Sequence, residues 1–257
     1  MIALVTGASS GIGKDISIEL AKKNYNLILV ARNEEKLNDL KNYIEKNFKV
    51  NAYVKKCDLS KKANCINLHD EIFDEFGCID ILINNAGFGT CGYFTDTDLD
   101  KELSMINTNI SALHILMKLF LKDMVKVDKG RILNVASIAG FMPGPLMATY
   151  YSSKAYVVRL SQSVKQELIM KHSHVKINCL CPGPVNTNFN KVADVKFSIS
   201  GQSSKFVAKV AVWKLLNNWM CLIFTSIPIF LYRIIVKILP DQFSAFINFF
   251  MQHRKIQ

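Results

Sequence analysis

Residues 6–13, Thr-Gly-Ala-Ser-Ser-Gly-Ile-Gly, decide which fold this chain adopts. They follow a short apolar run and precede a segment in which Ile12, Ile16 and Leu20 share one helical face, so a glycine-rich turn joins a strand to a helix. Such a turn lets the backbone approach a pyrophosphate, and the helix N-terminus offers free N–H groups to it. The stretch therefore predicts a dinucleotide site. Its predicted residues are Gly7, Ser9, Ser10, Gly11, Ile12 and Gly13.

The same alternation of apolar runs and helical patterns continues over about the first 180 residues. Strands are predicted at residues 2–6, 26–31, 50–56, 79–83, 131–136 and 175–180, and two long helices at about 101–126 and 149–171. The strands do not alternate apolar with polar residues, and a helix follows each, which is typical of a parallel sheet covered on both faces. We expect an α/β fold, a single Rossmann-type doubly wound parallel sheet with a C-terminal helical extension, forming one domain over residues 1–257.

Composition narrows the class of protein. Half of the 257 residues are apolar, which is enough for one large core. The seven cysteines form an odd set without a Cys-x-x-Cys pair, so we expect reduced thiols and neither a disulfide framework nor a metal site. The first residues lack the pattern of a secretory signal, which indicates a cytoplasmic protein.

The net charge of +11 is unevenly distributed along the chain. From residue 196 onward there are eight Lys or Arg residues and one acid, Asp241. The excess of positive charge therefore concerns the last quarter of the chain and does not indicate a general nucleic-acid-binding protein. We expect no nucleic acid among its partners.

The second predicted strand ends in Ala31 and Arg32. An NAD site has a carboxylate at this place, about 20 residues after the glycines, which bonds the ribose 2′-hydroxyl. Here that carboxylate is missing, and the Arg32 guanidinium suits a 2′-phosphate, although a solvated surface arginine is the alternative. The pattern favours NADP as the cofactor.

Four motifs stand in order along the chain. They are residues 6–13, Asn-Asn-Ala-Gly at 84–87, Ser137 with Tyr150-x-x-x-Lys154, and Pro-Gly-Pro-Val-Asn-Thr at 182–187. With these motifs, about residues 1–190 resemble the short-chain dehydrogenase/reductase family. The resemblance implies an oxidoreductase whose catalytic set is Asn109, Ser137, Tyr150 and Lys154.

The residue types support this catalytic set. Hydride transfer to a carbonyl needs a proton donor at the developing alkoxide, and a free tyrosine, with a pKa of about 10, exchanges protons poorly near neutral pH. Lys154 lies one helical turn from Tyr150, so its charge, with that of an oxidised nicotinamide, is expected to lower the tyrosine pKa. Ser137 can hydrogen-bond the substrate oxygen. Tyr151 and Ser153 are neighbouring candidates that lack the four-residue spacing to Lys154.

The resemblance implies further roles. Asn109 would hold a water that links the lysine to solvent, and Asn107 is the competing residue. Asp58 would lie near the adenine, although it could instead cap the following helix. The other implied cofactor contacts are Asn85, Ala86, Gly87, Pro182, Gly183, Val185 and Thr187, together with Tyr150 and Lys154.

The resemblance ends at about residue 190, and residues 190–257 are expected to form a variable substrate lid, polar at 196–204, and the C-terminal extension. No charge occurs between Lys214 and Arg233, but Pro228 and two asparagines interrupt this run and disfavour a membrane span.

We expect instead a seventh strand near residues 220–227, then helices, so that residues 219–251 complete the core and roof an apolar pocket. Aromatic residues at helical spacing from Phe243, next to the local positive charge, leave two further interpretations open. They could rest on an anionic bilayer or receive an acyl-carrier phosphate.

Together these patterns predict an NADP(H)-dependent oxidoreductase that reduces a carbonyl, or oxidises the alcohol, of a small apolar molecule. A ketone, a steroid-like ketone and a 3-oxoacyl thioester are the candidate substrates. The alternatives are a non-catalytic NADP-sensing scaffold and a membrane-associated lipid-modifying reductase. The resemblance also implies a homodimer or homotetramer, paired through the helices at about 101–126 and 149–171.

Overall fold

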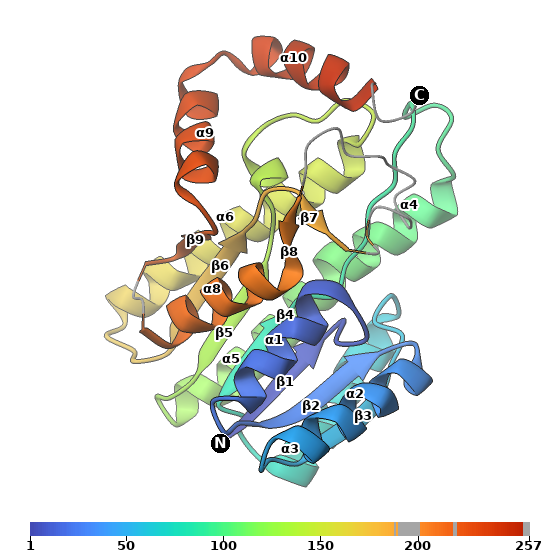
Figure 1. The fold of residues 1–257 in the computed structure, drawn as a ribbon. Coiled ribbons are helices and arrows are strands. Elements are labelled where there is room, and N and C mark those ends of the chain that lie inside the picture. The colour runs from blue at the N-terminus through green and yellow to red at the C-terminus, as the bar shows by residue number, and fades with distance from the viewer. Residues whose placement is uncertain (188, 190–200, 218–219, 254–257) are drawn as a thin grey trace.

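A twisted parallel sheet forms the centre of the molecule (Figure 1). The structure is a computed structural model, and it describes residues 1–187, 189, 201–217 and 220–253. Among these residues, seven strands pair in the order β3-β2-β1-β4-β5-β6-β9, all parallel. Their bounds are β1 (Ile2–Thr6), β2 (Asn26–Ala31), β3 (Ala52–Lys56), β4 (Ile81–Asn84), β5 (Arg131–Val135), β6 (Lys176–Cys181) and β9 (Leu222–Phe224). A separate parallel pair is formed by β7 (Val185–Asn186) and β8 (Gln202–Ser203).

Helices cover both faces of the sheet, as the strand composition predicts. One face packs on α1 (Gly11–Ala21), α2 (Glu34–Asn47) and α8 (Ser204–Asn217). The other packs on α3 (Lys62–Phe76), α5 (Leu113–Lys126) and α6 (Ala148–Met170). Within β2, Leu27 and Leu29 face the first layer and Ile28 and Val30 the second, and all four are buried. Apolar side chains of β2 thus enter both layers, and the doubly wound parallel fold is confirmed.

The helix predicted at about 101–126 is interrupted. It consists of α4 (Leu99–Ile106), a π-helical turn η1 (Asn107–Ala112) and α5. The Thr108 hydroxyl donates to the Ser104 carbonyl oxygen at 2.9 Å inside this stretch. Single π-helical turns within α-helices often occur at functional sites, and this one carries Asn109.

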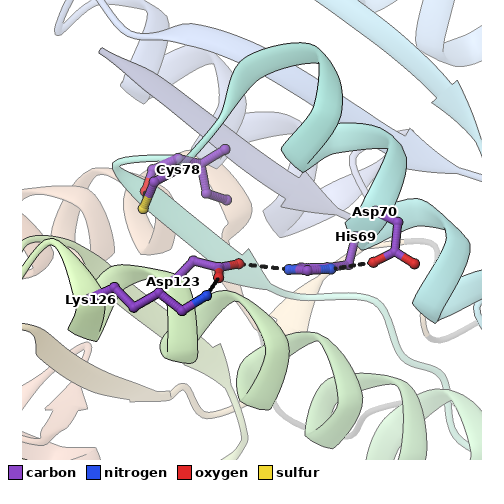
Figure 2. A network of polar contacts seen from close by, with 6 residues as sticks. His69, Asp70, Cys78, Asp123 and Lys126 are labelled. Carbon is purple, nitrogen blue, oxygen red and sulfur yellow. Dashed lines mark hydrogen bonds and ion pairs between the residues drawn. The ribbon is translucent and has the colours of Figure 1, made fainter.

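A polar network joins α3 to α5 (Figure 2). The His69 ring lies between two carboxylates, with Nε2 2.8 Å from Asp123 Oδ2 and Nδ1 2.8 Å from Asp70 Oδ1. Lys126 donates to the other oxygen of Asp123 at 3.0 Å, and Cys78 lies nearby. Asp123 is buried, whereas the Asp70 side chain is 63% exposed. His69 and Asp70 both lie on α3, so the contact between His69 and Asp123 is the one that joins the two helices.

The seventh strand expected near residues 220–227 is β9, which pairs with β6. It is followed by α9 (Ile227–Ile238) and α10 (Asp241–His253), which extend away from the sheet (Figure 1). Pro228 stands in the first turn of α9, where its missing N–H costs nothing, so it begins a helix and does not break one. Of the described residues, no helix is long and apolar enough to cross a membrane.

Two expectations about the last quarter of the chain need qualification. β9 completes the sheet, but most apolar side chains of α9 and α10 are exposed, so these helices do not complete the core. The lid expected at residues 196–204 falls mostly outside the described residues. Its end, Gln202 and Ser203, forms β8.

Candidate active site

The glycine-rich turn between β1 and α1 has the backbone shape that its sequence predicts. Gly7 and Gly11 have φ angles of 65° and 54°, a region that strongly favours glycine. A Cβ atom at Gly13 would lie 2.4 Å from the Gly7 carbonyl oxygen, so helix and turn pack closely here. Ser10 precedes α1 without capping it through its side chain, which leaves the first N–H groups of the helix available to a ligand.

Hydrogen bonds from the loop that follows β4 hold this turn in place. The Thr6 hydroxyl oxygen accepts the backbone N–H of Asn85 at 2.9 Å and of Ala86 at 3.0 Å. The Asn85 side-chain amide donates to the carbonyl oxygens of Thr6 at 3.0 Å and Gly7 at 3.3 Å. Because β1 lies beside β4 at the point where strand order reverses, these bonds align two loops at the usual ligand crevice of such sheets. Thr6 was not among the predicted site residues, although its place at the end of β1 is visible in the sequence.

One cavity of about 830 Å³ opens above the carboxyl ends of these strands. It brings together nearly all of the predicted cofactor and catalytic residues. These are Gly7, Ser9, Ser10, Gly11, Ile12, Arg32, Asp58, Asn85, Ala86, Gly87, Ser137, Tyr150, Lys154, Pro182, Gly183, Val185 and Thr187. The other two, Gly13 and Asn109, lie behind this lining and act on it through the residues that they contact.

Arg32 and Asp58 stand at one end of the cavity, after β2 and β3. Asp58 does not cap α3, whose N-cap residue is Lys61. Its carboxylate instead accepts hydrogen bonds from the Ser60 hydroxyl at 2.8 Å and backbone N–H at 3.1 Å. Burial raises the pKa of Asp58, but the bonds from Ser60 and the charge of Arg32 outweigh it, so the net shift is downward and the group is ionised at neutral pH.

Ser137, Tyr150 and Lys154 meet at the other end. Ser137 follows β5 and begins a short 3-10 turn, η2 (Ile138–Phe141), and its hydroxyl is hydrogen-bonded to Tyr150. Tyr150 and Lys154 are one turn apart near the start of α6, as predicted. The Lys154 ammonium donates to the Val135 carbonyl oxygen at 3.0 Å and lies 5.8 Å from the centre of the Tyr150 ring.

Burial shifts the pKa values of Tyr150 and Lys154 in opposite directions. Burial raises the pKa of Tyr150 to about 12, and the Ser137 hydrogen bond offsets only part of that rise. The lowering expected from Lys154 together with an oxidised nicotinamide concerns the nucleotide complex and stays a prediction. Burial also lowers the pKa of Lys154 to about 8, because its ammonium is removed from water. Tyr150 is thus protonated at neutral pH and can donate a proton, and the pKa of the neighbouring Lys154 lies only slightly above neutral pH.

Asn109 supports this arrangement from the π-helical turn. Its amide donates to the Phe88 carbonyl oxygen at 2.9 Å and to the Ser153 hydroxyl at 3.1 Å, and its carbonyl oxygen accepts the Phe88 N–H at 3.1 Å. Ser153 in turn donates to the Tyr150 carbonyl oxygen at 2.7 Å. Asn107, the competing residue, is exposed. Asn109 therefore ties the loop after β4 to α6, while its predicted contact with a water stays a prediction.

One further part of the cavity wall is mostly apolar and lies beyond the predicted residues. It comes from the end of η2, the start of α6, residue 189, α9 and α10. The residues concerned are Met142, Met147, Tyr151, Phe189, Pro228, Ile229, Tyr232, Asn248 and Gln252. The expected roof over an apolar pocket is thus present, but its members come from segments about 100 residues apart, which no local pattern relates.

The geometry fits a dinucleotide. Gly7 and Gly11 let the turn pack closely on Asn85, Ala86 and Thr187 while its backbone lines the cavity beside the uncapped N-terminus of α1, where a pyrophosphate would bind. Arg32 offers a cation at the far end. Among the described residues, no group of three or more His, Cys, Asp or Glu could hold a metal ion. Beside such a nucleotide, Tyr150, Ser137 and Lys154 could exchange a proton with a substrate.

Comparison with known proteins gives one consistent result. The family model described as short chain dehydrogenase matches residues 1–196. An uncharacterised oxidoreductase of Staphylococcus epidermidis is 34% identical over 193 residues, which are 75% of this chain and 81% of the relative. A very-long-chain 3-oxoacyl-CoA reductase of Laccaria bicolor is 34% identical over 170 residues, 65% of this chain and 50% of the relative. Among solved structures, a short-chain dehydrogenase from Sphingobium yanoikuyae in complex with NADPH is similar, with a TM-score of 0.82, 26% identity and 88% of each chain covered.

Proposed function

The chain belongs to the short-chain dehydrogenase family, a family of oxidoreductases, and from that membership we propose that it uses NADP(H) to reduce the carbonyl group of an apolar substrate. The observation that carries the proposal is the single cavity that joins the glycine-rich turn and Arg32 to Tyr150, Ser137 and Lys154. A dinucleotide bound along the turn would reach the hydroxyl groups of Tyr150 and Ser137, because the turn and these two residues line the same cavity.

The residues of the chain would handle the proton. Bound NADPH would supply the hydride. Tyr150 donates its hydroxyl proton to the carbonyl oxygen as charge develops there, and Ser137 donates a hydrogen bond to the same oxygen. A protonated Lys154 stabilises the tyrosinate that this leaves, since an opposite charge nearby favours the ionised form.

An apolar substrate suits the end of the cavity beyond Tyr150. Met147 is buried with Tyr150, Tyr151 and Phe189 packed on it, and the Tyr150 and Phe189 rings lie 5.2 Å apart. An apolar wall with a few converging hydroxyls is typical of a small-molecule site. The Laccaria relative is named for a 3-oxoacyl thioester, so we propose such thioesters and bulky ketones as the first substrates to assay.

Tyr150→Phe tests the proposal. We expect turnover, followed by NADPH absorbance, to fall about 10²- to 10⁴-fold, because the proton donor is removed while the ring is retained. NADPH affinity should stay within a few-fold. The matched control is Tyr156→Phe on the same helix, whose hydroxyl contacts His114 at 2.7 Å outside the cavity lining. A Tyr150→Phe enzyme that keeps a tenth or more of wild-type kcat would contradict the assignment.

A further inference from the structure

Helix α10 has its polar side inward. Ser244, Asn248 and Gln252, four residues apart, are buried, and Asn248 is only 3% exposed. The Asn248 amide donates to the Pro143 carbonyl oxygen at 2.8 Å, and the Gln252 amide donates to the Tyr151 hydroxyl. The opposite side of the helix is exposed and apolar, with Phe246 62% exposed. Helices on the surface of globular proteins normally have the reverse arrangement.

Helix α9 exposes an apolar side as well. Ile229, Tyr232 and Val236 lie on its inner side, where the first two line the cavity. Arg233 also turns inward, with its guanidinium 5.4 Å from the centre of the Phe141 ring. The outer side is apolar apart from Lys237, and Ile238 at its end is 77% exposed.

We name the exposed apolar side chains of these two consecutive helices the outer apolar face. Its members are Ile227, Phe230, Leu231, Ile234, Ile235 and Ile238 of α9, and Phe243, Phe246, Ile247 and Phe250 of α10. Helices α9 and α10 stand at one end of the molecule, away from the sheet (Figure 1). Scattered exposed apolar residues are ordinary, but ten of them on adjoining helices indicate a surface that binds another protein or a membrane.

The charge of this part of the chain indicates which of these covers the outer apolar face. Arg233 turns inward, but Lys237 lies on the outer side of α9, and the sequence that directly follows α10 adds Arg254 and Lys255, against a single acid, Asp241. A second copy placed on this face by two-fold symmetry would bring two positive segments together. An anionic lipid surface complements them, and basic residues beside an apolar helix face are typical of helices that lie in a membrane interface.

We propose that the outer apolar face docks on the surface of an anionic lipid bilayer without crossing it. The inner sides of α9 and α10 roof the cavity, so docking brings the cavity next to the apolar phase of the membrane. Delivery of an apolar carbonyl substrate by this route rests on the proposed function, whereas docking itself does not. Vesicle binding tests docking without any catalytic readout.

The experiment measures co-sedimentation with vesicles of phosphatidylcholine alone and of phosphatidylcholine mixed with phosphatidylglycerol. We expect wild-type protein to bind the mixed vesicles, and the double variant Ile234→Glu with Phe246→Glu to bind at least tenfold more weakly. The control is Tyr43→Glu with Val127→Glu, which adds the same two charges at exposed apolar positions on α2 and just after α5. This control variant should bind the mixed vesicles about as well as wild-type protein does, because its outer apolar face is intact. Lys237→Glu should weaken binding several-fold while leaving every apolar side chain in place.

Circular dichroism and the thermal shift caused by NADPH check that each variant is folded. If the Ile234/Phe246 variant does not fold, Lys237→Glu alone decides. Sedimentation velocity without lipid distinguishes the other occupant, a second copy. Wild-type protein that binds neither vesicle, or binds both equally, overturns the proposal. So does an Ile234/Phe246 variant that lowers the oligomeric mass while vesicle binding stays at the control level.

Discussion

Lys154 is a buried cation in the wall of the candidate site, with 6% of its surface exposed. Burial lowers its pKa from 10.5 to about 8, so the protonated form is less stable in the folded than in the unfolded chain. A shift of this size corresponds to on the order of 3 kcal/mol. The residue therefore costs stability at neutral pH, where its charge is needed beside Tyr150.

Replacing it separates stability from activity. We expect Lys154→Met to raise the free energy of unfolding at pH 7 by about 1–3 kcal/mol while activity is lost. Between about pH 8 and 10.5 the unfolded wild-type chain binds more protons than the folded one, so wild-type stability rises with pH. The advantage of the variant should therefore be full below about pH 8 and absent near pH 10.5. Urea unfolding at several pH values measures this, and a variant less stable than wild type at pH 7 would refute it.

Arg32 should decide cofactor preference. The proposal that it binds a 2′-phosphate predicts that Ala31→Asp combined with Arg32→Ser shifts preference from NADPH toward NADH. A charge-assisted hydrogen bond contributes about 1.5–3 kcal/mol, so the ratio of kcat/KM values should change by more than about tenfold. Wild-type enzyme that already prefers NADH would count against the role of Arg32.

At the scale of elements, the junction of α4, η1 and α5 shows how a helix serves the site. A regular α-helix through residues 99–126 would carry Asn109 at a different angle, whereas the π-helical turn directs it to Phe88 and Ser153. The sequence marks Asn109 as a candidate, but its partners, Phe88 after β4 and Ser153 on α6, come from segments far along the chain.

The hydrogen bond between His69 of α3 and Asp123 of α5 gives a prediction at the same scale (Figure 2). Burial raises the pKa of Asp123, but hydrogen bonds from His69 and Lys126 outweigh it, and the net shift is downward. Asp123→Asn should therefore lower the free energy of unfolding at pH 7 by about 1.5–3 kcal/mol. Because a lowered carboxyl pKa stabilises the fold only above the unfolded value of 3.8, the difference should shrink as the pH falls below about 4.

Asp70→Asn is the matched control for this pair. Asp70 contacts the other nitrogen of the same His69 ring, but its side chain is 63% exposed. Exposed pairs contribute at most about 1 kcal/mol, so urea unfolding should show a small change. Equal effects of the two substitutions would mean that burial of Asp123 does not matter.

At the scale of the whole molecule, ligand binding should stabilise the chain as one unit, since the cavity is lined from the turn after β1 to α10. NADPH at about 100 times its Kd should add about 2.7 kcal/mol to the free energy of unfolding. For a chain of this size that corresponds to a rise in Tm of roughly 5–10 °C. NADH at the same concentration should give a smaller rise. Differential scanning fluorimetry measures both, and equal shifts would contradict the proposed NADP preference.

Assembly and location remain predictions for the whole chain. We propose one domain over residues 1–257, paired as a homodimer or homotetramer through α5 and α6. Docking by the outer apolar face on α9 and α10 uses a different surface, so both can hold at once.

The sequence by itself determined the order of strands and helices, the glycine-rich turn and the spacing of Tyr150 and Lys154. These features depend on local sterics and on the periods of strand and helix, which neighbouring residues set. Tertiary structure alone decided the π-helical turn at Asn109, the raised pKa of Tyr150 and the inward polar side of α10. Each of these depends on what a residue is buried against, and the partners come from segments far apart in the chain. Burial and desolvation are properties of the packed molecule, so no local pattern could have supplied them.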